Sequence, residues 1–340
     1  MKPKIVIDKN IPFILEALEG KFNVISLPAN QINKNAVKDA TAMLIRTRTL
    51  CNKELLEGST VKFIGTATIG YDHIDLDWCK NNEITVKTAA GCNAGGVVNY
   101  VLRCLIEFEC VPAETTIGII GVGNVGSLLN ERLTHWGFKT LLCDPIRAIN
   151  EPLNEFLSYE DVLKNSDVVT FHTPLTYEGE HKTFELLNKK SLEKCKNGVK
   201  IINSSRGEIV NDSDLVNALK KGKVSSCAID VWNNEPNINL ELLGLADITT
   251  PHIAGYSVQG KANGSAIVVN ELFRHQNHNN INNWYPKNIT KRTYLDTTWE
   301  QLKITLTSDY KILDETNSLK NNASNFEKFR NEYNFRNEIL

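Results

Sequence analysis

The sequence contains no run of apolar residues long enough to span a bilayer, and its start shows no secretory signal peptide. Its 8 cysteines include no C-x-x-C pair, and no cysteine–histidine cluster has the spacing of a zinc site. Basic charge is not in excess either, because the formal net charge of the 340 residues is -2. These absences predict a cytoplasmic protein with reduced thiols, no metal site and no general affinity for nucleic acid or membranes. An anionic small molecule would have to be held by a few placed cations.

Short apolar runs rich in valine and isoleucine alternate with helical patterns over most of the chain. The first series of predicted strands comprises 4–8, 22–27, 42–47, 62–68 and 84–89. The second series comprises 116–121, 139–144, 167–172, 199–205, 226–231 and 247–255. This alternation predicts an α/β fold with two Rossmann-like, doubly wound parallel-sheet domains.

The composition shifts after about residue 275. The segment 274–288 is polar and rich in asparagine, which is typical of a linker or loop. Beyond it we expect a small C-terminal α+β appendage, with one strand in 302–312 and one or two helices that include 325–339. Such a unit is too small to bury much surface alone, so we expect it to pack on the main body or on a second subunit.

The segment GVGNVG places Gly121, Gly123 and Gly126 in the G-x-G-x-x-G spacing, between an apolar strand and a helix. The first glycine permits a tight turn, the second lets the backbone approach a pyrophosphate, and the third lets the helix pack on the strand. The next strand ends at Asp144, whose carboxylate can bind a ribose 2′-hydroxyl and repel the 2′-phosphate of NADP. The alternative is a glycine-rich helix start with a solvated aspartate. We favour an NAD site formed by Gly121, Gly123, Asn124, Val125, Gly126 and Asp144.

Charged residues follow three later strands. Arg206 follows one, Asp230 and Glu235 follow another, and His252 follows a third. Ligands of doubly wound sheets bind beyond the carboxyl ends of the strands, so these side chains are expected to converge. Arginine can bind a substrate carboxylate bidentately, and histidine can transfer the proton of an alcohol beside a carboxylate that favours its charged form. Taken singly, each could instead be a turn or loop residue.

The set GVGNVG, Asp144, SRG, NNEP and PHIAG resembles the D-isomer-specific 2-hydroxyacid dehydrogenases over about residues 1–275. This resemblance implies that Arg206 binds the substrate carboxylate and carbonyl, and that Glu235 pairs with His252. His252 would be the acid/base that exchanges the proton of the C2 hydroxyl while hydride passes between C2 and the nicotinamide. It also implies a substrate-binding domain of 1–95 plus about 255–280, an NAD-binding domain of 96–254 and a C-terminal dimerisation unit of 285–340 in a homodimer.

Further site residues are implied by the resemblance alone. Thr173, Asp230 and Gly255 would complete the cofactor site, while His172 and His73 are read as structural. The first domain and the segment after His252 are most similar to the branch of the family that oxidises 4-phospho-D-erythronate at C2, on the way to pyridoxal 5′-phosphate. In that branch the substrate would be bound by Arg46, Thr47, Thr68 and Tyr256. Arg46 is preferred for binding the phosphate. Arg48 is equally consistent with a binding role and with a solvated side chain at the end of the strand.

The sequence departs from the family pattern at Gly95, Gly96 and Asn99. Two glycines near the start of the helix predicted in 93–109 weaken it by roughly 1 kcal/mol each, and Asn99 stands where an acidic residue is expected. The other readings are a phosphoglycerate, glyoxylate or lactate dehydrogenase with the same catalytic set, or a non-catalytic NAD-sensing module. Retention of Arg206, Glu235 and His252 argues against the module.

Overall fold

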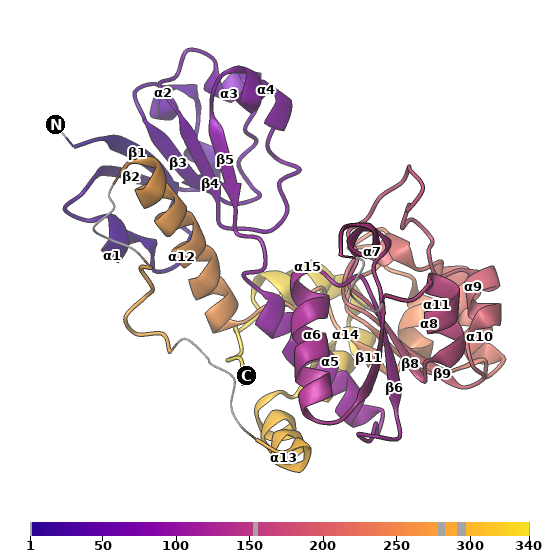
Figure 1. The fold of residues 1–340 in the computed structure, drawn as a ribbon. Helices are drawn as coiled ribbons and strands as arrows, with labels where there is room; N and C mark the ends of the chain where they lie inside the picture. The colour runs from indigo at the N-terminus through magenta and orange to yellow at the C-terminus, as the bar shows by residue number, and fades with distance from the viewer. Residues whose placement is uncertain (1, 152–155, 278–282, 291–296, 340) are drawn as a thin grey trace. The chain divides into compact units, whose positions relative to one another are not determined.

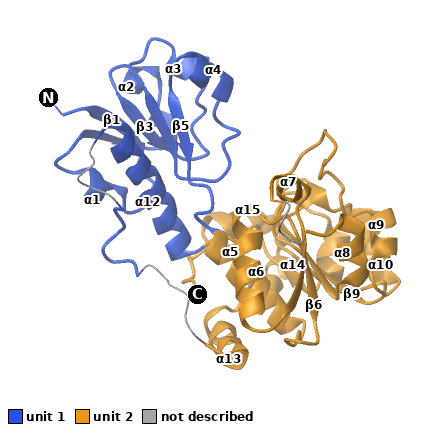
Figure 2. Cartoon of the chain, viewed as in Figure 1, with its two compact units in different colours: residues 1–93, 257–292 blue, residues 94–256, 293–340 orange. Residues whose placement is uncertain are grey.

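The structure is a computed structural model that describes residues 2–151, 156–277, 283–290 and 297–339. Two compact units make up the chain (Figure 2): Met1–Asn93 with Ser257–Arg292, and Ala94–Tyr256 with Thr293–Leu340. From residue 297 on, the described part of the C-terminal segment groups with the second unit, so it packs on the main body, one of the two arrangements expected for it. Each unit is described by itself below.

The first unit contains a five-stranded parallel sheet in the order β2-β1-β3-β4-β5 (Figure 1). Its strands are β1 (Lys4–Asp8), β2 (Asn23–Leu27), β3 (Ala42–Ile45), β4 (Phe63–Thr66) and β5 (Thr85–Thr88). The central strands β3 and β4 are buried throughout, as short apolar strands of parallel sheets are. Successive side chains point to opposite faces, so each strand needs cover on both.

Helices provide that cover on both faces of the first sheet. Ile5, Ile7, Leu44 and Phe63 pack in one cluster with residues of α1 (Ile14–Leu18) and the long α12 (Val258–His275). Val6, Met43, Ile45 and Ile64 pack in another with residues of α2 (Lys34–Val37), α3 (Lys53–Leu56) and α4 (Leu76–Asn81). A short 3-10 helix, η1 (Ala29–Gln31), precedes α2. The first unit is thus doubly wound, with its last helix supplied by a distant part of the sequence.

The second unit contains a six-stranded parallel sheet in the order β11-β10-β9-β8-β6-β7. Its strands are β6 (Thr116–Ile120), β7 (Lys139–Cys143), β8 (Val168–Phe171), β9 (Val199–Asn203), β10 (Val224–Ile229) and β11 (Ile248–Thr249). The connecting helices are α5 (Ala94–Glu107), α6 (Asn124–His135), α7 (Pro145–Asn150), α8 (Tyr159–Asn165), α9 (Lys189–Lys194), η2 (Gly207–Ile209), α10 (Asp212–Lys220) and α11 (Leu240–Leu245). From β6 the chain adds β7 on one side of the sheet and then β8 to β11 on the other. Doubly wound sheets bind their ligands at this point, where the strand order reverses.

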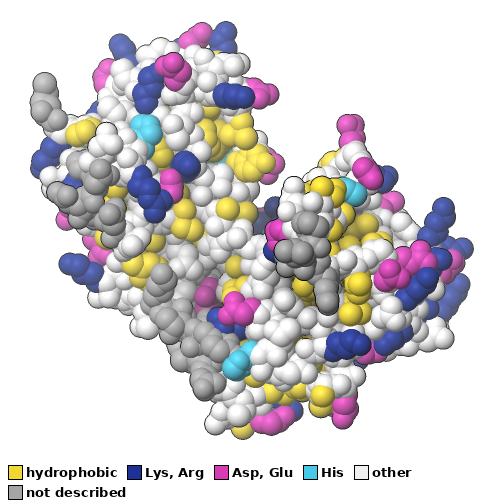
Figure 3. Space-filling model, viewed as in Figure 1, with side chains coloured by type: hydrophobic (Ala, Val, Ile, Leu, Met, Phe, Trp, Pro, Cys, Tyr) yellow, Lys and Arg dark blue, Asp and Glu magenta, His cyan; other side chains and the backbone are white. Residues whose placement is uncertain are grey.

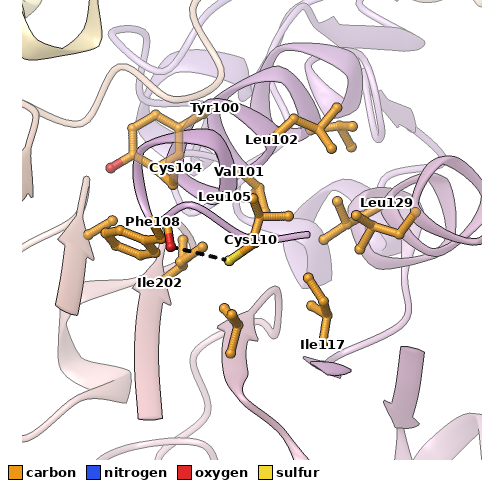
Figure 4. Packing of buried hydrophobic residues seen from close by; sticks show 14 of the residues in the cluster. Tyr100, Val101, Leu102, Cys104, Leu105, Phe108, Cys110, Ile117, Leu129 and Ile202 are labelled. Carbon is orange, nitrogen blue, oxygen red and sulfur yellow. Dashed lines mark hydrogen bonds between the residues drawn. The ribbon is translucent and has the colours of Figure 1, made fainter. Parts of the chain in front are cut away.

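Alternation along these strands separates two core clusters. Ile117 and Ile119 of β6 pack with residues of α5 and α6, including Tyr100, Leu105 and Leu129 (Figure 4). Ile120 of the same strand belongs to the opposite cluster, which contains residues of α8, α9, α10 and α11. The two-residue period of β6 therefore covers both faces, and both predicted sheets are confirmed as doubly wound α/β layers.

The C-terminal segment is helical over the part that the structure describes, with α13 (Trp299–Asp309), α14 (Ile312–Asn321), η3 (Ala323–Asn325) and α15 (Phe326–Asn331). The strand predicted in 302–312 is wrong, because most of it lies in α13. Thr298 and Gln301 form a reciprocal capping box at the start of that helix. Trp299, Leu302 and Leu306 lie at helical spacing and are buried in the cluster around α5 and α6. This packing outweighs the strand-like alternation of isoleucine, leucine and threonine.

The surface carries charges of both signs. Basic and acidic side chains are interspersed on the face seen in Figure 3, in keeping with a formal net charge of -2. Within the described ranges, no helix combines the length and the apolar character needed to cross a membrane.

Candidate active site

The predicted catalytic side chains of the second unit all follow strands at the carboxyl edge of its sheet. Arg206 follows β9, Glu235 follows β10, and His252 follows β11. These three strands are consecutive in the order β11-β10-β9. The loops after them therefore lie beside one another, as the sequence predicted.

His252 and Glu235 form a hydrogen-bonded pair. The His252 Nδ1 atom lies 2.9 Å from Glu235 Oε2 and 3.1 Å from Oε1. Glu235 Oε1 also accepts a hydrogen bond from the backbone N–H of Trp232, at 3.0 Å. Because Glu235 occupies Nδ1, the Nε2 atom is left as the acid/base position of the ring. The side chain of His252 is 30% exposed and that of Glu235 is 17% exposed, so the pair is sheltered while the histidine stays accessible.

The carboxyl group of Glu235 is held in its charged form. Burial alone would raise the pKa of Glu235. The hydrogen bond and charge of His252, the Trp232 N–H and the charge of Arg330 outweigh burial, and the pKa lies below its ordinary value. A charged Glu235 favours a protonated Nδ1 and keeps the imidazole in one orientation.

The loop that carries His252 is fastened by Asp230, which is 1% exposed. Asp230 Oδ1 accepts the Thr250 hydroxyl at 2.6 Å and the Ile253 N–H at 2.8 Å, and Oδ2 accepts the Ala254 N–H at 3.0 Å. Burial raises the pKa of Asp230, although the charge of His252 and these hydrogen bonds oppose it. The structure thus gives Asp230 a supporting role in the loop, and its contact with the cofactor stays a prediction.

His252 itself has a left-handed backbone, with φ of 58°. Such a conformation costs a non-glycine residue roughly 1–3 kcal/mol and persists only where neighbouring contacts hold it. Its N–H donates to the Asp230 carbonyl at 2.8 Å, and the two following amides bind the Asp230 carboxylate. Gly255 follows in the same turn. The unusual backbone is therefore imposed by the loop.

Arg336, which no sequence motif indicated, holds the same loop through its carbonyl groups. It donates to the Ile253 carbonyl at 3.0 Å, to the Ala254 carbonyl, and to the Gly96 carbonyl at 3.1 Å. Its guanidinium lies 4.3 Å from the centre of the Tyr310 ring. The His252 loop is therefore held by an aspartate through its amides and by an arginine through its carbonyls.

Arg330 is a second residue near the His252–Glu235 pair that the sequence analysis missed. Its Nη1 lies 3.5 Å from Glu235 Oε2, and its Nε lies 3.4 Å from the Tyr256 hydroxyl. The only sequence signal would have been FRNEYNFR, where two arginines alternate with aromatic residues at the end of a polar segment. That signal is too weak to assign to a site without the fold.

The SRG segment places Arg206 beside the loop of Glu235. A Cβ atom on Gly207 would overlap the backbone of Trp232 and Asn233, so only glycine allows the two loops to approach. Asn203 fixes the turn by donating to the Arg206 carbonyl at 2.9 Å. The Arg206 guanidinium is exposed, and its Nη1 donates to the Ser205 carbonyl at 2.7 Å. Its charge is thus available to an anionic ligand.

The glycine loop fits the pyrophosphate of a dinucleotide. Gly121 has φ of 87°, and a Cβ there would crowd the backbone of His172. A Cβ on Gly126 would overlap the Gly121 carbonyl, whereas one on Gly123 would meet open space. Helix α6 starts at Asn124, next to Val125, with no side-chain cap on its first amides. A close-packed turn, an open second glycine and an uncapped helix start are the features that a pyrophosphate needs.

Asp144 ends β7 beside this loop. Its Oδ2 accepts the Val122 N–H at 2.9 Å, and its Oδ1 accepts the Arg147 N–H at 3.0 Å, which caps α7. Each carboxylate oxygen can accept more than one hydrogen bond. These two hydrogen bonds fix the position of the Asp144 carboxylate. Its binding of a ribose hydroxyl stays a prediction.

Two buried hydroxyl groups lie just after strands β8 and β9, and the Thr173 side chain is close to Gly121 of the glycine loop. Thr173 Oγ1 and Ser204 Oγ have no hydrogen-bond partner among the described residues. Such orphaned polar atoms fit a site whose bound group supplies the partner. His172 Nε2 is bonded to the Thr170 hydroxyl at 3.0 Å, and burial lowers its pKa to about 3. His172 is thus a neutral support for the segment that holds Thr173.

The first unit holds its predicted substrate residues at the carboxyl ends of β3 and β4. Arg46 Nε forms an ion pair with the fully buried Asp8 at 3.0 Å. Thr47 and Arg48 are exposed beside it. Of the two arginines in the RTR segment, the structure therefore orients Arg46 by a buried carboxylate.

Thr68 is held by a short chain of hydrogen bonds. The Thr66 and Thr68 hydroxyls are 2.6 Å apart, and His73 Nε2 lies 3.2 Å from Thr66 Oγ1. Burial lowers the pKa of His73, with the charge of Asp72 opposing it. His73 thus supports Thr68 indirectly. In the second unit, Tyr256 packs edge-to-face against Tyr333 and Phe335, with ring centres 6.0 and 5.8 Å apart.

Comparison with known proteins was made on this basis. Residues 110–254 match the family model described as D-isomer specific 2-hydroxyacid dehydrogenase, NAD binding domain. The chain is 39% identical over 343 residues to an erythronate-4-phosphate dehydrogenase of Bacteroides fragilis, covering 98% of this chain and 97% of that protein. A protein of the same name from Photorhabdus laumondii is 43% identical over 271 residues, covering 78% and 72%.

A solved structure is similar in fold. The D-lactate dehydrogenase of Aquifex aeolicus, complexed with NAD and lactic acid, superposes with a TM-score of 0.61 at 25% identity. The match covers 84% of this chain and 100% of that one. The alignment with the Bacteroides protein covers 98% of this chain, so it extends into the C-terminal segment.

Proposed function

The chain belongs to the erythronate-4-phosphate dehydrogenases within the D-isomer-specific 2-hydroxyacid dehydrogenase family, and we propose that it oxidises 4-phospho-D-erythronate at C2. The cofactor is NAD, and the product is 2-oxo-3-hydroxy-4-phosphobutanoate, an intermediate on the way to pyridoxal 5′-phosphate. The observation that carries the proposal is the His252–Glu235 pair at the carboxyl edge of an NAD-binding sheet, with the exposed Arg206 beside it.

The reaction removes a hydride from C2 and a proton from the C2 hydroxyl. Bound NAD supplies the hydride acceptor. His252 Nε2 takes the hydroxyl proton as the C2–O bond becomes a carbonyl, and Glu235 stabilises the resulting imidazolium through Nδ1. Arg206 binds the C1 carboxylate and polarises the developing carbonyl oxygen. One hydride and one proton leave, so a secondary alcohol becomes a ketone.

Binding of the rest of the substrate is assigned to hydroxyl groups and one cation. Arg46 uses Nε to bind Asp8, and we assign its terminal nitrogens to the phosphate. Thr47, Thr68 and Tyr256 supply hydroxyls suited to the hydroxyls of C2 and C3. The cofactor is held by Gly121, Gly123, Asn124, Val125, Gly126, Asp144, Thr173, Asp230 and Gly255.

The direct test is formation of reduced nicotinamide, followed by absorbance, when the protein is mixed with NAD and 4-phospho-D-erythronate. Parallel reactions contain 3-phosphoglycerate, glycolate or D-lactate, with and without 2-oxoglutarate as a recycling acceptor. Turnover of the erythronate ester alone supports the proposal. Turnover of only another acid keeps the family and the catalytic set but contradicts the substrate. Tight NAD binding without turnover of any acid would favour an NAD-sensing module.

A cytoplasmic location and a homodimer belong to the same proposal. Each of the eight cysteines is buried and lies outside any disulfide bond, the state that a reducing compartment maintains. Burial raises the pKa of Cys51 to about 12, so this thiol stays protonated and unreactive. Light scattering of the purified protein measures the oligomeric state directly, and a monomer at enzyme-assay concentration would contradict the homodimer.

A further inference from the structure

The C-terminal helix α15 brings a cation to the catalytic pair. Arg330 Nη1 lies 3.5 Å from Glu235 Oε2, the oxygen that also lies 2.9 Å from His252 Nδ1. A guanidinium and an imidazole nitrogen therefore face one carboxylate oxygen. This contact is not part of the Arg206, Glu235 and His252 set, and its residue comes from a segment outside the matched NAD-binding domain of 110–254.

The same guanidinium contacts Tyr256. Its Nε donates to the Tyr256 hydroxyl at 3.4 Å. The Tyr256 ring packs edge-to-face against the rings of Tyr333 and Phe335. Arg330 is therefore a bridge between the acid/base pair and a residue assigned to the substrate. One side chain touches both groups from the side of the C-terminal segment.

Helix α15 is fixed well enough to place this side chain. Phe326 is fully buried in the cluster that contains residues of α10 and α11, and Phe329 packs against the same cluster. The Arg330 side chain is 29% exposed and also lies 3.9 Å from Glu327 Oε1 on its own helix. The buried Phe326 thus anchors α15, and α15 places the flexible Arg330 side chain against Glu235.

We propose that Arg330 is a positioning residue of the dehydrogenase reaction, acting through Glu235 and Tyr256. It fixes the Glu235 carboxylate against His252 and holds the Tyr256 hydroxyl, so the segment after 293 completes the site within the second unit. The proposal deepens the proposed function and rests on it for the identity of the substrate. It assigns Arg330 no direct contact with the substrate phosphate.

The charged groups around this centre determine the expected pH effect. Three groups face the Glu235 carboxylate: His252 from the loop after β11, Arg330 from α15, and the Trp232 N–H from the loop that carries Glu235 itself. Asp230 lies behind His252, and Glu327 and Tyr256 face Arg330. Removing the Arg330 cation takes away one of the charges that keep the Glu235 carboxyl ionised. The pKa of Glu235 should then rise, and the acid limb of activity should move to higher pH.

The test compares Arg330→Gln and Arg330→Lys with Lys328→Gln, which removes an exposed charge from the same helix. In Arg330→Gln we expect kcat to fall about tenfold, with the acid limb of kcat/KM moved upward by roughly half a pH unit, the scale of a partly exposed ion pair. Arg330→Lys should recover most of the pH profile, and Lys328→Gln should match the parent protein. A KM increase of tenfold or more with an unchanged pH profile would overturn the proposal, because it would indicate direct substrate binding.

A second readout is independent of turnover. The Glu235 carboxyl can be titrated by ¹³C NMR in protein labelled at glutamate side-chain carboxyls, with the signal assigned by Glu235→Gln. An upward shift in Arg330→Gln but not in Lys328→Gln supports the positioning role, even if 4-phospho-D-erythronate is not the substrate. No shift in either variant overturns it, whatever acid the parent protein oxidises.

Discussion

The two sheets place their functional side chains alike, at the carboxyl ends of parallel strands, but hold them differently. In the second unit, His252 is fixed by Glu235, and its loop by Asp230 and Arg336, which come from distant parts of the sequence. In the first unit, Arg46 is held by one buried carboxylate and Thr68 by a short hydroxyl chain. An acid/base has to be placed more accurately than a group that only binds. The contrast therefore predicts that the second unit controls kcat and the first controls KM.

The largest effect on kcat is expected from removal of the proposed acid/base. We expect His252→Ala to lower kcat by roughly two to four powers of ten, because that is the usual contribution of a positioned acid/base. NAD binding, measured by quenching of protein fluorescence, should stay near that of the parent protein. Parent-like turnover in this variant would remove His252 from the mechanism.

The matching change in the first unit is Arg46→Gln, with Arg48→Gln as its control. A charge-assisted hydrogen bond contributes roughly 1.5–3 kcal/mol, so loss of the Arg46 cation should raise KM for the phosphorylated acid about 10- to 100-fold. The effect on kcat should be small. Arg48 is exposed and should contribute little to KM. If steady-state kinetics instead showed the larger KM change in Arg48→Gln, the phosphate assignment would pass to that residue.

A smaller effect is expected on cofactor choice. Asp144→Asn keeps the side-chain shape and an oxygen that can accept the Arg147 N–H, but it removes the charge that opposes a 2′-phosphate. The ratio of kcat/KM for NAD to that for NADP should fall by about tenfold. Thermal unfolding provides the control, since a stability change would report a lost cap. An unchanged ratio means that Asp144 does not discriminate the two cofactors.

The smallest effect on turnover is expected at His172, which supports the cofactor segment without titrating at neutral pH. Its pKa is lowered to about 3 by burial. The unfolded chain therefore binds a proton at His172 that the folded chain does not, in the window between this value and about 6.5. Stability from this residue is complete above that window and is lost as the pH falls through it.

His172→Gln should accordingly leave kcat at pH 7 nearly unchanged and flatten the loss of stability between pH 6.5 and 3. Urea unfolding at several pH values measures this slope in both proteins. An equally steep acid loss in the variant would assign the pH dependence to other groups, such as Glu235, whose lowered pKa acts in the same direction.

Much of this organisation could be predicted because it is local. Short apolar strands, the glycine loop and the charged residues after strands are written in contiguous sequence, and the structure places Arg206, Glu235 and His252 on neighbouring loops. The strand predicted in 302–312 failed because Trp299, Leu302 and Leu306 pack against distant helices. Arg330 and Arg336 were missed for the same reason, since only the fold brings them to the β10 and β11 loops.

The departures at the start of α5 show the same limit. Gly95 and Gly96 suggested a weakened helix, but Glu338 packs where a Gly95 Cβ would lie, and the Gly96 carbonyl binds Arg336. Asn99, found where an acidic residue was expected, accepts the Ile339 N–H at 2.8 Å. Two glycines that looked unfavourable for the helix and an asparagine that departs from the family pattern therefore form the docking site of the last described residues. A sequence pattern judged element by element cannot show that compensation.

The hydrogen bonds of Arg336 to the His252 loop affect when this loop can become ordered during synthesis of the chain. Arg336 lies 83 residues beyond Ile253, whose carbonyl it binds. A nascent chain that has left the ribosome as far as Tyr256 already carries the glycine loop and the three side chains proposed to be catalytic. It does not yet carry the guanidinium that secures the left-handed turn at His252. The turn that carries His252 should therefore gain its full set of contacts only after the C-terminal segment has been made.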